Sequence, residues 1–227
     1  MMLSKKESNS ELIQIMLDYQ DKLNTELKGE DWKSQNLQWY RAIWIECAEL
    51  MDCFPWKWWA KVETDLDNAL IEIVDIWHFI LSWSLQQDYP LAITLGIIEY
   101  AKTTTKGELS IEKITEGIEL LAKYALDKDF VGTIYAFYSL LSNFSCGIKT
   151  LAKIYFGKNT LNYFRKLKGI QEGTYNRYWN GVEDNKVMLR LIKEVKADIR
   201  EVEEFQKELM SLLEKEYQKH FQTSKQI

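Results

Sequence analysis

Hydrophobic positions recur with helical spacing along most of the chain. Between residues 11 and 27 the apolar side chains fall three or four positions apart, which places them on one side of a helix. The same spacing predicts further helices at about 37–53 and 67–87, from about 111, at 130–144 and 148–167, and from about 183 to the C-terminal tail. We therefore expect a helical bundle.

Few residues interrupt these helices, because the chain holds only 2 prolines and 10 glycines. Phe54-Pro55 ends one predicted helix, and Pro90 begins another. Glycines punctuate a loop that we place at about 169–183 and expect to be mobile. Because no segment shows strand alternation with hairpin chemistry, the prediction is one all-α domain over residues 1–227 that ends in a C-terminal helix.

Two apolar segments each carry a pair of acids three residues apart. Glu46 and Glu49 lie in AIWIECAELM, and Glu72 and Asp75 lie in LIEIVDIWHFIL. Residues three apart share one face of a helix, whereas a strand would place them on opposite faces. A single E-x-x-E pair is most often a solvated helix face. Around Glu72 and Asp75, however, every other residue from 69 to 77 is apolar, so this helix is expected to be buried nearly all round.

Four buried carboxylates need a partner charge. An ionised carboxylate is costly to bury, and like charges nearby raise that cost. Oxygen ligands without Cys or His spacing select Mg²⁺, or Mn²⁺ in its place, over Zn²⁺. The pattern predicts two helices that form a four-carboxylate box for two or more ions. A di-iron centre is the weaker interpretation, since it uses a Glu-x-x-His motif from each of two helices and only His78 follows an acid here.

A basic segment complements the acids. Residues 44–75 are rich in Asp and Glu, and residues 157–190 are rich in Lys and Arg. Polar and basic side chains on one helical face and in the following loop could hold phosphates: Lys158, Asn162, Arg165, Tyr175 and Arg177. Taken alone they would be an ordinary exposed basic face. Together with a carboxylate metal box they favour a magnesium–triphosphate site.

Composition narrows the class of protein. A formal net charge of -5 argues against general binding to nucleic acid. The N-terminal residues lack an apolar signal core, and no apolar run reaches membrane-spanning length without a charge. The cysteines at 47, 53 and 146 lack metal spacing and fit reduced, structural thiols. We expect a cytoplasmic protein with neither a membrane nor a nucleic-acid partner.

Five motifs resemble those of the dimeric all-α dUTPases, within the all-α nucleoside triphosphate pyrophosphatases. They are ECAEL (46–50), PWKWW (55–59), EIVDIWHF (72–79), GKNTLNYFR (157–165) and GTYNRYWNGVEDN (173–185), within a region of about 12–190. The resemblance implies Mg²⁺-dependent hydrolysis of dUTP, and of dUDP, to dUMP by an intertwined helical homodimer. Such an enzyme keeps uracil out of DNA and supplies dUMP.

The resemblance also implies residue roles. The metal ligands would be Glu46, Glu49, Glu72 and Asp75, and Glu49 would also orient and deprotonate the attacking water. The nucleoside would be bound by Gln20, Asn24, Trp58 (or Trp56), His78, Phe79 and Asn185, with Asn185 reading the uracil edge. The phosphates would be held by Lys158, Asn162, Arg165, Tyr175 and Arg177. Two positions depart from the pattern: Val182 stands where many relatives carry lysine, and Ile170 where an aromatic residue is common.

Two alternatives remain open from the residues. A relative acting on another nucleotide, such as dCTP, would use the same chemistry with a different pocket around Asn185 and Gln20. A non-catalytic helical scaffold would have solvated acids and tryptophans that only pack. In either case we expect four tryptophans in the core or at a dimer interface: Trp32, Trp39, Trp44 and Trp83.

Overall fold

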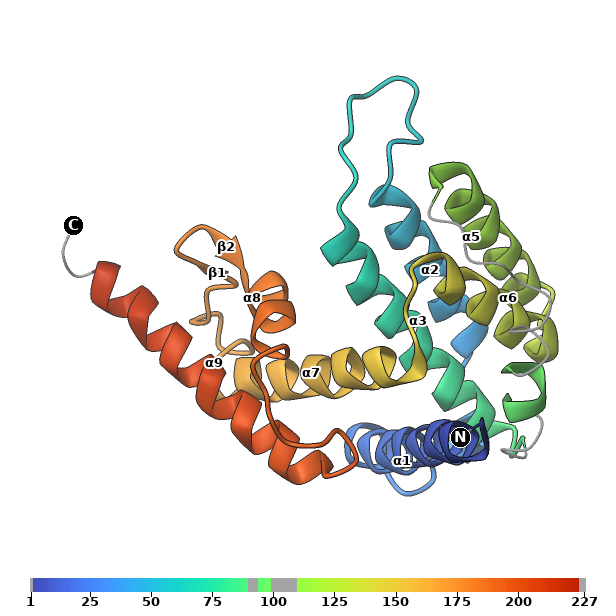
Figure 1. Ribbon diagram of the computed structural model, residues 1–227, viewed down its shortest axis with the longest axis horizontal. Helices are drawn as coiled ribbons and strands as arrows, with labels where there is room; N and C mark the ends of the chain where they lie inside the picture. Colours follow the sequence, from blue (N-terminus) through green and yellow to red (C-terminus); the bar gives the residue numbers. More distant parts are fainter. Residues whose placement is uncertain (1, 90–93, 99–109, 225–227) are drawn as a thin grey trace. The chain divides into compact units, whose positions relative to one another are not determined.

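The structure is a computed structural model that describes residues 2–89, 94–98 and 110–224 (Figure 1). Its elements follow in the order α1 (Met2–Lys28), the 3₁₀ helix η1 (Trp32–Gln35), α2 (Trp39–Asp52), α3 (Leu66–Gln86), α5 (Ile111–Leu126), α6 (Phe130–Asn143), α7 (Ile148–Leu167), β1 (Tyr178–Trp179), β2 (Val182–Glu183), α8 (Asp184–Leu191) and α9 (Val202–Ser224). The all-α prediction is confirmed. The helix expected to begin at Pro90 starts outside the described residues.

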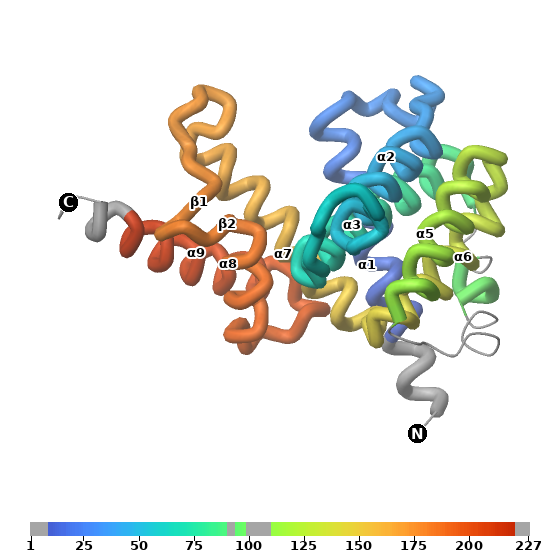
Figure 2. The backbone as a smooth tube through the Cα atoms, turned by 90° about the horizontal axis from the view of Figure 1, so that it is seen from above, coloured from blue at the N-terminus to red at the C-terminus, as the bar shows by residue number. Residues whose placement is uncertain are grey.

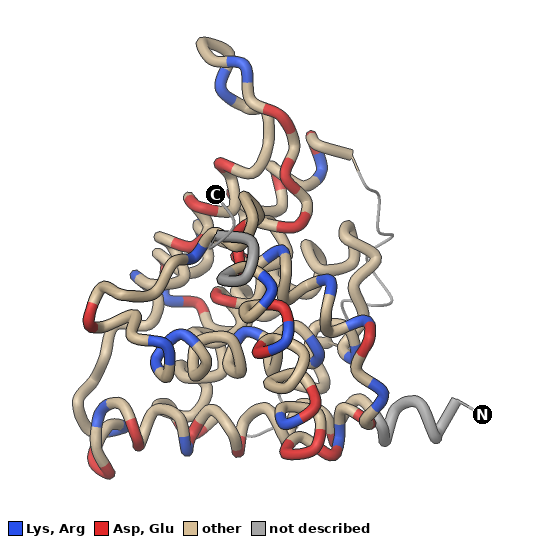
Figure 3. The backbone as a smooth tube through the Cα atoms, turned by 90° about the vertical axis from the view of Figure 1, so that its left-hand side faces the viewer, with Lys and Arg blue, Asp and Glu red and all other residues tan. Residues whose placement is uncertain are grey.

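The chain divides into two compact units, residues 1–150 and 151–227, with the boundary inside α7. The single domain over residues 1–227 stays a prediction. No helix among the described residues is both long enough and apolar enough to cross a membrane. Figure 3 shows Lys and Arg interspersed with Asp and Glu over the described chain, so the distribution of charged residues alone does not mark a site.

In the first unit α3 is the central helix. It packs against α1 and α2, while α5 packs against α2 and α6 (Figure 2). The Asp65 side chain caps the N-terminus of α3 by accepting a hydrogen bond from the backbone N–H of Asn68. Trp77 is fully buried and stacks on Phe137 with ring centroids 5.2 Å apart. The buried side chains of α3 lie on nearly every face of the helix, as the apolar run predicted.

The four tryptophans expected in the core or at an interface divide into two groups. Trp32 and Trp83 are buried, which confirms their place in the core. Trp39 is half-buried and donates its indole N–H to Gln86 Oε1 at 3.0 Å. Trp44 is 43% exposed on α2, and its place at a dimer interface stays a prediction.

In the second unit a short hairpin occupies part of the predicted loop. β1 pairs antiparallel with β2, with Trp179 opposite Val182. The two turn residues, Asn180 and Gly181, both have positive φ, 50° and 82°. Asn-Gly is the preferred dipeptide for a two-residue type I′ hairpin turn. The prediction that no hairpin chemistry occurs was therefore wrong here, although the hairpin has only two residues in each strand.

The predicted helix from about 183 to the tail is also wrong, because it is two helices. α8 ends at Leu191, and α9 begins at Val202. Between them the Glu208 carboxylate accepts hydrogen bonds from the backbone N–H groups of Lys196 and Ala197, at 3.1 and 3.0 Å. That carboxylate satisfies two N–H groups that a continuous helix would have bonded internally. Ile199 is fully buried, so the apolar spacing continues through the break and conceals it.

Candidate active site

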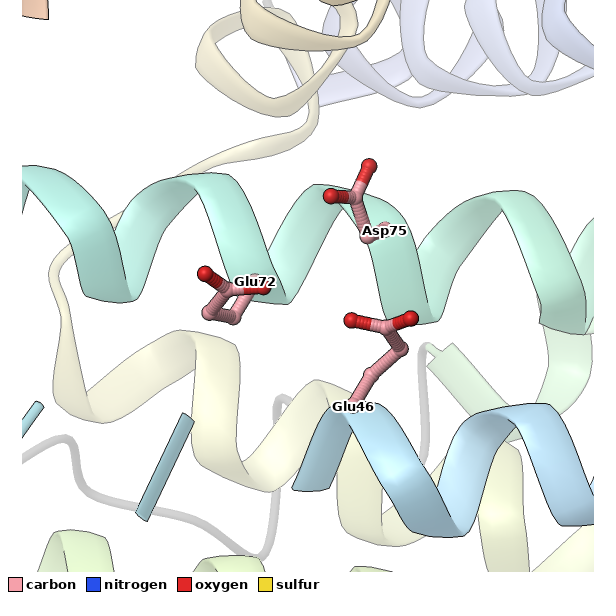
Figure 4. A group of neighbouring side chains, drawn as sticks. All are labelled: Glu46, Glu72 and Asp75. Carbon is pink, nitrogen blue, oxygen red and sulfur yellow. The ribbon is translucent and has the colours of Figure 1, made fainter. Parts of the chain in front are cut away.

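The acidic cluster is built by two packed helices. α2 carries Glu46, and α3 carries Glu72 and Asp75 (Figure 4). One carboxylate oxygen from each residue lies within 4.8 Å of the others. Glu72 is buried, and Glu46 and Asp75 are half-buried. Thus the two acids spaced three apart on α3 do share one face, as predicted, and one acid of α2 faces them.

Glu49 is not part of this close group. It lies three residues after Glu46 on α2, and its side chain is exposed. Its negative charge nevertheless acts on the cluster, because it is one of the charges that raise the pKa of Glu46. The structure thus brings together three of the four predicted metal ligands. The role of Glu49 as ligand and base stays a prediction.

Mutual repulsion and burial alter the protonation of the cluster. The pKa of Glu46 is raised from 4.5 to about 8, first by burial and then by the charges of Asp75, Glu49 and Glu72, with a hydrogen bond to Glu72 adding to the effect. Without a cation, the cluster therefore holds a proton at neutral pH. A divalent cation bound to these carboxylates would displace that proton and offset the repulsion among their negative charges.

The donor set fits a hard divalent cation. Three carboxylates offer oxygen ligands, which suit Mg²⁺ or Mn²⁺. The neighbouring Cys47 is no thiolate ligand, because burial, followed by the Glu46 charge, raises the pKa of its thiol to about 12. His78 Nδ1 lies 2.7 Å from the Val74 carbonyl oxygen, which can only accept, so this nitrogen carries the proton.

A buried chain of polar side chains joins α1 to α3. Gln20 Nε2 donates to Asn24 Oδ1, Asn24 Nδ2 donates to Ser82 Oγ, and Ser82 Oγ donates to the His78 carbonyl oxygen, at 3.0, 3.0 and 2.9 Å. The structure therefore places two predicted nucleoside residues, Gln20 and Asn24, against the stretch of α3 that carries His78 and Phe79. Sequence reasoning missed Ser82. Its signal was a polar residue four positions after His78, directly following the apolar residues 79–81.

The predicted stacking tryptophans follow α2. Trp58 is 90% exposed and meets Trp59 edge-on with ring centroids 5.2 Å apart. Trp56 is 41% exposed and donates its indole N–H to Asp52 Oδ1 at 3.2 Å. Phe79, on α3, stacks on Trp39 at 6.1 Å. Both Trp56 and Trp58 keep ring surface open to solvent, and which of them stacks on the base stays a prediction.

The predicted phosphate ligands lie in the second unit, where Arg165 forms a buried ion pair. Its Nε and Nη2 donate to the two carboxylate oxygens of Asp184 at 2.8 and 2.7 Å. The Tyr175 hydroxyl donates to the same carboxylate at 2.7 Å, and Asp184 is fully buried. Burial, followed by the hydrogen bond to Asp184, raises the pKa of Tyr175. For Arg165, burial opposes the charged form, and the hydrogen bond and charge of Asp184 raise the pKa above its usual value.

The other predicted phosphate ligands are placed differently. Lys158 is buried, whereas Arg177 is exposed. Asn162 is exposed and accepts a hydrogen bond at Oδ1 from Arg165 Nη1 at 3.0 Å. Sequence reasoning gave Asp184 no role at the site. Its signal was an acid between Glu183 and Asn185, late in a basic segment.

These features are those of an all-α nucleoside triphosphate pyrophosphohydrolase, with a cluster of three acids on two packed helices. A family model described as dUTPase matches residues 12–170, and the chain belongs to that family. The protein is accordingly a dUTP diphosphatase. None of the curated proteins compared with the chain matches it.

Proposed function

We propose that this dUTPase hydrolyses both dUTP and dUDP to dUMP and requires Mg²⁺. The observation that carries the metal requirement is the cluster of Glu46, Glu72 and Asp75, in which the pKa of Glu46 rises to about 8. Three acids so close together are best accommodated by a divalent cation. A bound Mg²⁺ would neutralise phosphate oxygens and polarise the bond to be broken.

The acidic residues would bind the metal and activate the attacking water. Glu46, Glu72 and Asp75 would hold the cation, with Glu49 completing the set. Glu49 is exposed, so water has access to it, which supports its proposed second role of orienting and deprotonating the attacking water. Attack on the phosphorus next to the nucleoside would release pyrophosphate from dUTP and phosphate from dUDP.

Substrate contacts are proposed on the same basis. The buried amides Gln20 and Asn24 would face the nucleoside, and an exposed ring at Trp58 or Trp56 would stack on the base. His78 would lie near the base, and Phe79 would pack against the 2′ position of the sugar. Asn185 would read the uracil edge. The phosphates would be bound by Lys158, Asn162, Arg165, Tyr175 and Arg177.

We also propose that the enzyme is a homodimer. Large apolar side chains on the outer side of α2 support this, since Trp44 is 43% exposed and Ile45 is 46% exposed. Sedimentation at several protein concentrations tests the proposal. A monomer at micromolar concentration would contradict it.

The function is tested by measuring pyrophosphate and phosphate release from dUTP, dUDP, dCTP and dTTP, with Mg²⁺ and with EDTA. We expect rapid release from dUTP and dUDP with Mg²⁺ and none with EDTA. Preference for dCTP would assign the enzyme to another nucleotide. Release from none of the four nucleotides at saturating Mg²⁺ would favour a scaffold.

A further inference from the structure

Resting on the proposed role of Asn185 in reading the base, we infer that Arg165 determines base selectivity by holding the Asn185 amide in one orientation. Arg165 Nη2 donates to Asn185 Oδ1 at 3.0 Å. Asn185 Nδ2 lies 3.4 Å from Glu183 Oε1. Arg165 would thus be a positioning residue, because it acts on the base through Asn185.

The orientation of the amide follows from the chemistry of its two neighbours. A guanidinium has only donors, so the amide atom that faces Arg165 must be the oxygen. An ionised carboxylate has only acceptors, so the atom that faces Glu183 must be the nitrogen. The reversed amide would place N–H against N–H on one side and oxygen against oxygen on the other. Both neighbours therefore select the same orientation.

Arg165 cannot turn away to permit the reversed amide. Its guanidinium is held by both carboxylate oxygens of Asp184, and its Nη1 also donates to Asn162 Oδ1. Asp184 is fully buried and takes a third hydrogen bond from the Tyr175 hydroxyl. Arg165 and Asn185 are themselves 7% and 8% exposed. Turning the guanidinium would leave a buried carboxylate without its partner, which is costly.

The fixed amide matches uracil and not cytosine. Uracil offers an acceptor at O4 and a donor at N3–H, whereas cytosine offers donors at its 4-amino group and an acceptor at N3. Asn185 keeps one N–H beyond its contact with Glu183 and one oxygen lone pair beyond its contact with Arg165. These pair with O4 and N3–H of uracil. Cytosine would require the reversed amide, and a mismatch that leaves buried polar groups unpaired discriminates strongly.

Thymine provides an internal control, because it has the same O4 and N3–H edge as uracil. The amide orientation should therefore separate dUTP from dCTP but not dUTP from dTTP. If Arg165 acted only on phosphates, which all three nucleotides share, its loss would lower all three rates by the same factor. The two roles thus give different patterns of kcat/KM.

The test is Arg165→Lys, with kcat/KM measured for dUTP, dCTP and dTTP. Lysine keeps the positive charge beside Asp184 but lacks the planar fork that reaches Asp184 and Asn185 together. We expect the ratio of dUTP to dCTP to fall at least tenfold while the ratio of dUTP to dTTP stays within twofold. Arg190→Lys is the matched control, because Arg190 forms an exposed pair with Glu216, and it should change neither ratio. Folded, active Arg165→Lys with the wild-type dUTP to dCTP ratio would overturn the inference.

A second variant keeps the test decisive if Arg165→Lys does not fold. Glu183 is only half-buried, and Glu183→Gln offers the amide a donor as well as an acceptor. We expect the dUTP to dCTP ratio to stay within twofold, because Arg165 still holds the amide oxygen of Asn185. A tenfold fall would show that Glu183, and not Arg165, sets the orientation of the amide, and it would overturn the inference. Failure of the proposed function is distinguishable, because the wild-type enzyme would then show no preference for dUTP before any variant is made.

Discussion

Replacing Glu46 by glutamine should stabilise the metal-free protein, and increasingly so as pH rises. The wild-type Glu46 has its pKa raised from 4.5 to about 8, first by burial and then by Asp75, Glu49 and Glu72. Below pH 4.5 it is neutral in both the folded and unfolded states. Between 4.5 and 8 the unfolded chain loses the proton while the folded chain keeps it, so wild-type stability falls as pH rises. Glutamine does not ionise and avoids that loss.

The size of the effect follows from the geometry. At the 4.8 Å that bounds the cluster, two unit charges repel by about 1 kcal/mol in surroundings like water and by about 3.5 kcal/mol at an effective dielectric of 20. Since Glu46 is only half-buried, we expect Glu46→Gln to gain about 1–3 kcal/mol relative to wild type by pH 8, and little at pH 4.5. Above pH 8 the difference should level off.

The measurement is chemical denaturation in EDTA at pH 4.5, 6.5, 8 and 9, with Glu26→Gln, an exposed acid of α1, as the control. Repeating it with Mg²⁺ should reverse the order, because the cation stabilises the wild type and the variant lacks one ligand. A stability difference between Glu46→Gln and wild type that is the same at every pH would refute the reasoning. So would a wild type whose stability is indifferent to Mg²⁺ at pH 8.

Three further results are expected. Glu49→Gln should abolish dUTP turnover and leave the helical circular dichroism intact, because the exposed carboxylate serves chemistry rather than packing; turnover retained at saturating Mg²⁺ would exclude its role as base. Asn185→Asp should lower dUTP turnover and narrow the gap to dCTP, because it removes the N–H that pairs with O4; unchanged rates for both would show that Asn185 does not read the base. Gly157→Ala should cost about 1–3 kcal/mol of stability in urea, because a Cβ there would lie 2.7 Å from Met188 Sδ and 3.0 Å from Ile192 Cγ2, and wild-type stability would show that the core can relax.

The helices could be predicted from the sequence because their signal is local. Apolar spacing placed α2, α3, α5, α6 and α7 to within two residues at the ends that were predicted. The buried character of α3 followed from an apolar run broken by two acids. The spacing does not identify which residue of a neighbouring helix each side chain contacts. Glu46 and Glu49 share a face equally well by sequence, and only the packing of α2 shows that Glu46 meets the cluster while Glu49 is exposed.

The second unit was harder to predict, for two physical reasons. The break before α9 depends on Glu208, whose carboxylate bonds to backbone groups 11 and 12 residues earlier. The partner of Arg165 is Asp184, which lies 19 residues away at the start of α8. Such pairings arise from tertiary packing and leave no periodic trace in the sequence. The hairpin is different, since the dipeptide Asn180-Gly181 is a local sequence signal for a two-residue hairpin turn.

The buried polar chain from Gln20 to Ser82 has a consequence for how the first unit tolerates change. Each amide in it is both donor and acceptor, so the chain has a direction that runs from α1 into the backbone of α3 at His78. Sliding α1 along α3 by even one residue would break the hydrogen bond from Asn24 to Ser82, which is the link in this chain that crosses between the two helices. Apolar contacts alone could be remade after such a slip, but this buried hydrogen bond could not. The helix that carries two proposed nucleoside contacts is thereby held in a single register against the helix that carries two of the proposed metal ligands.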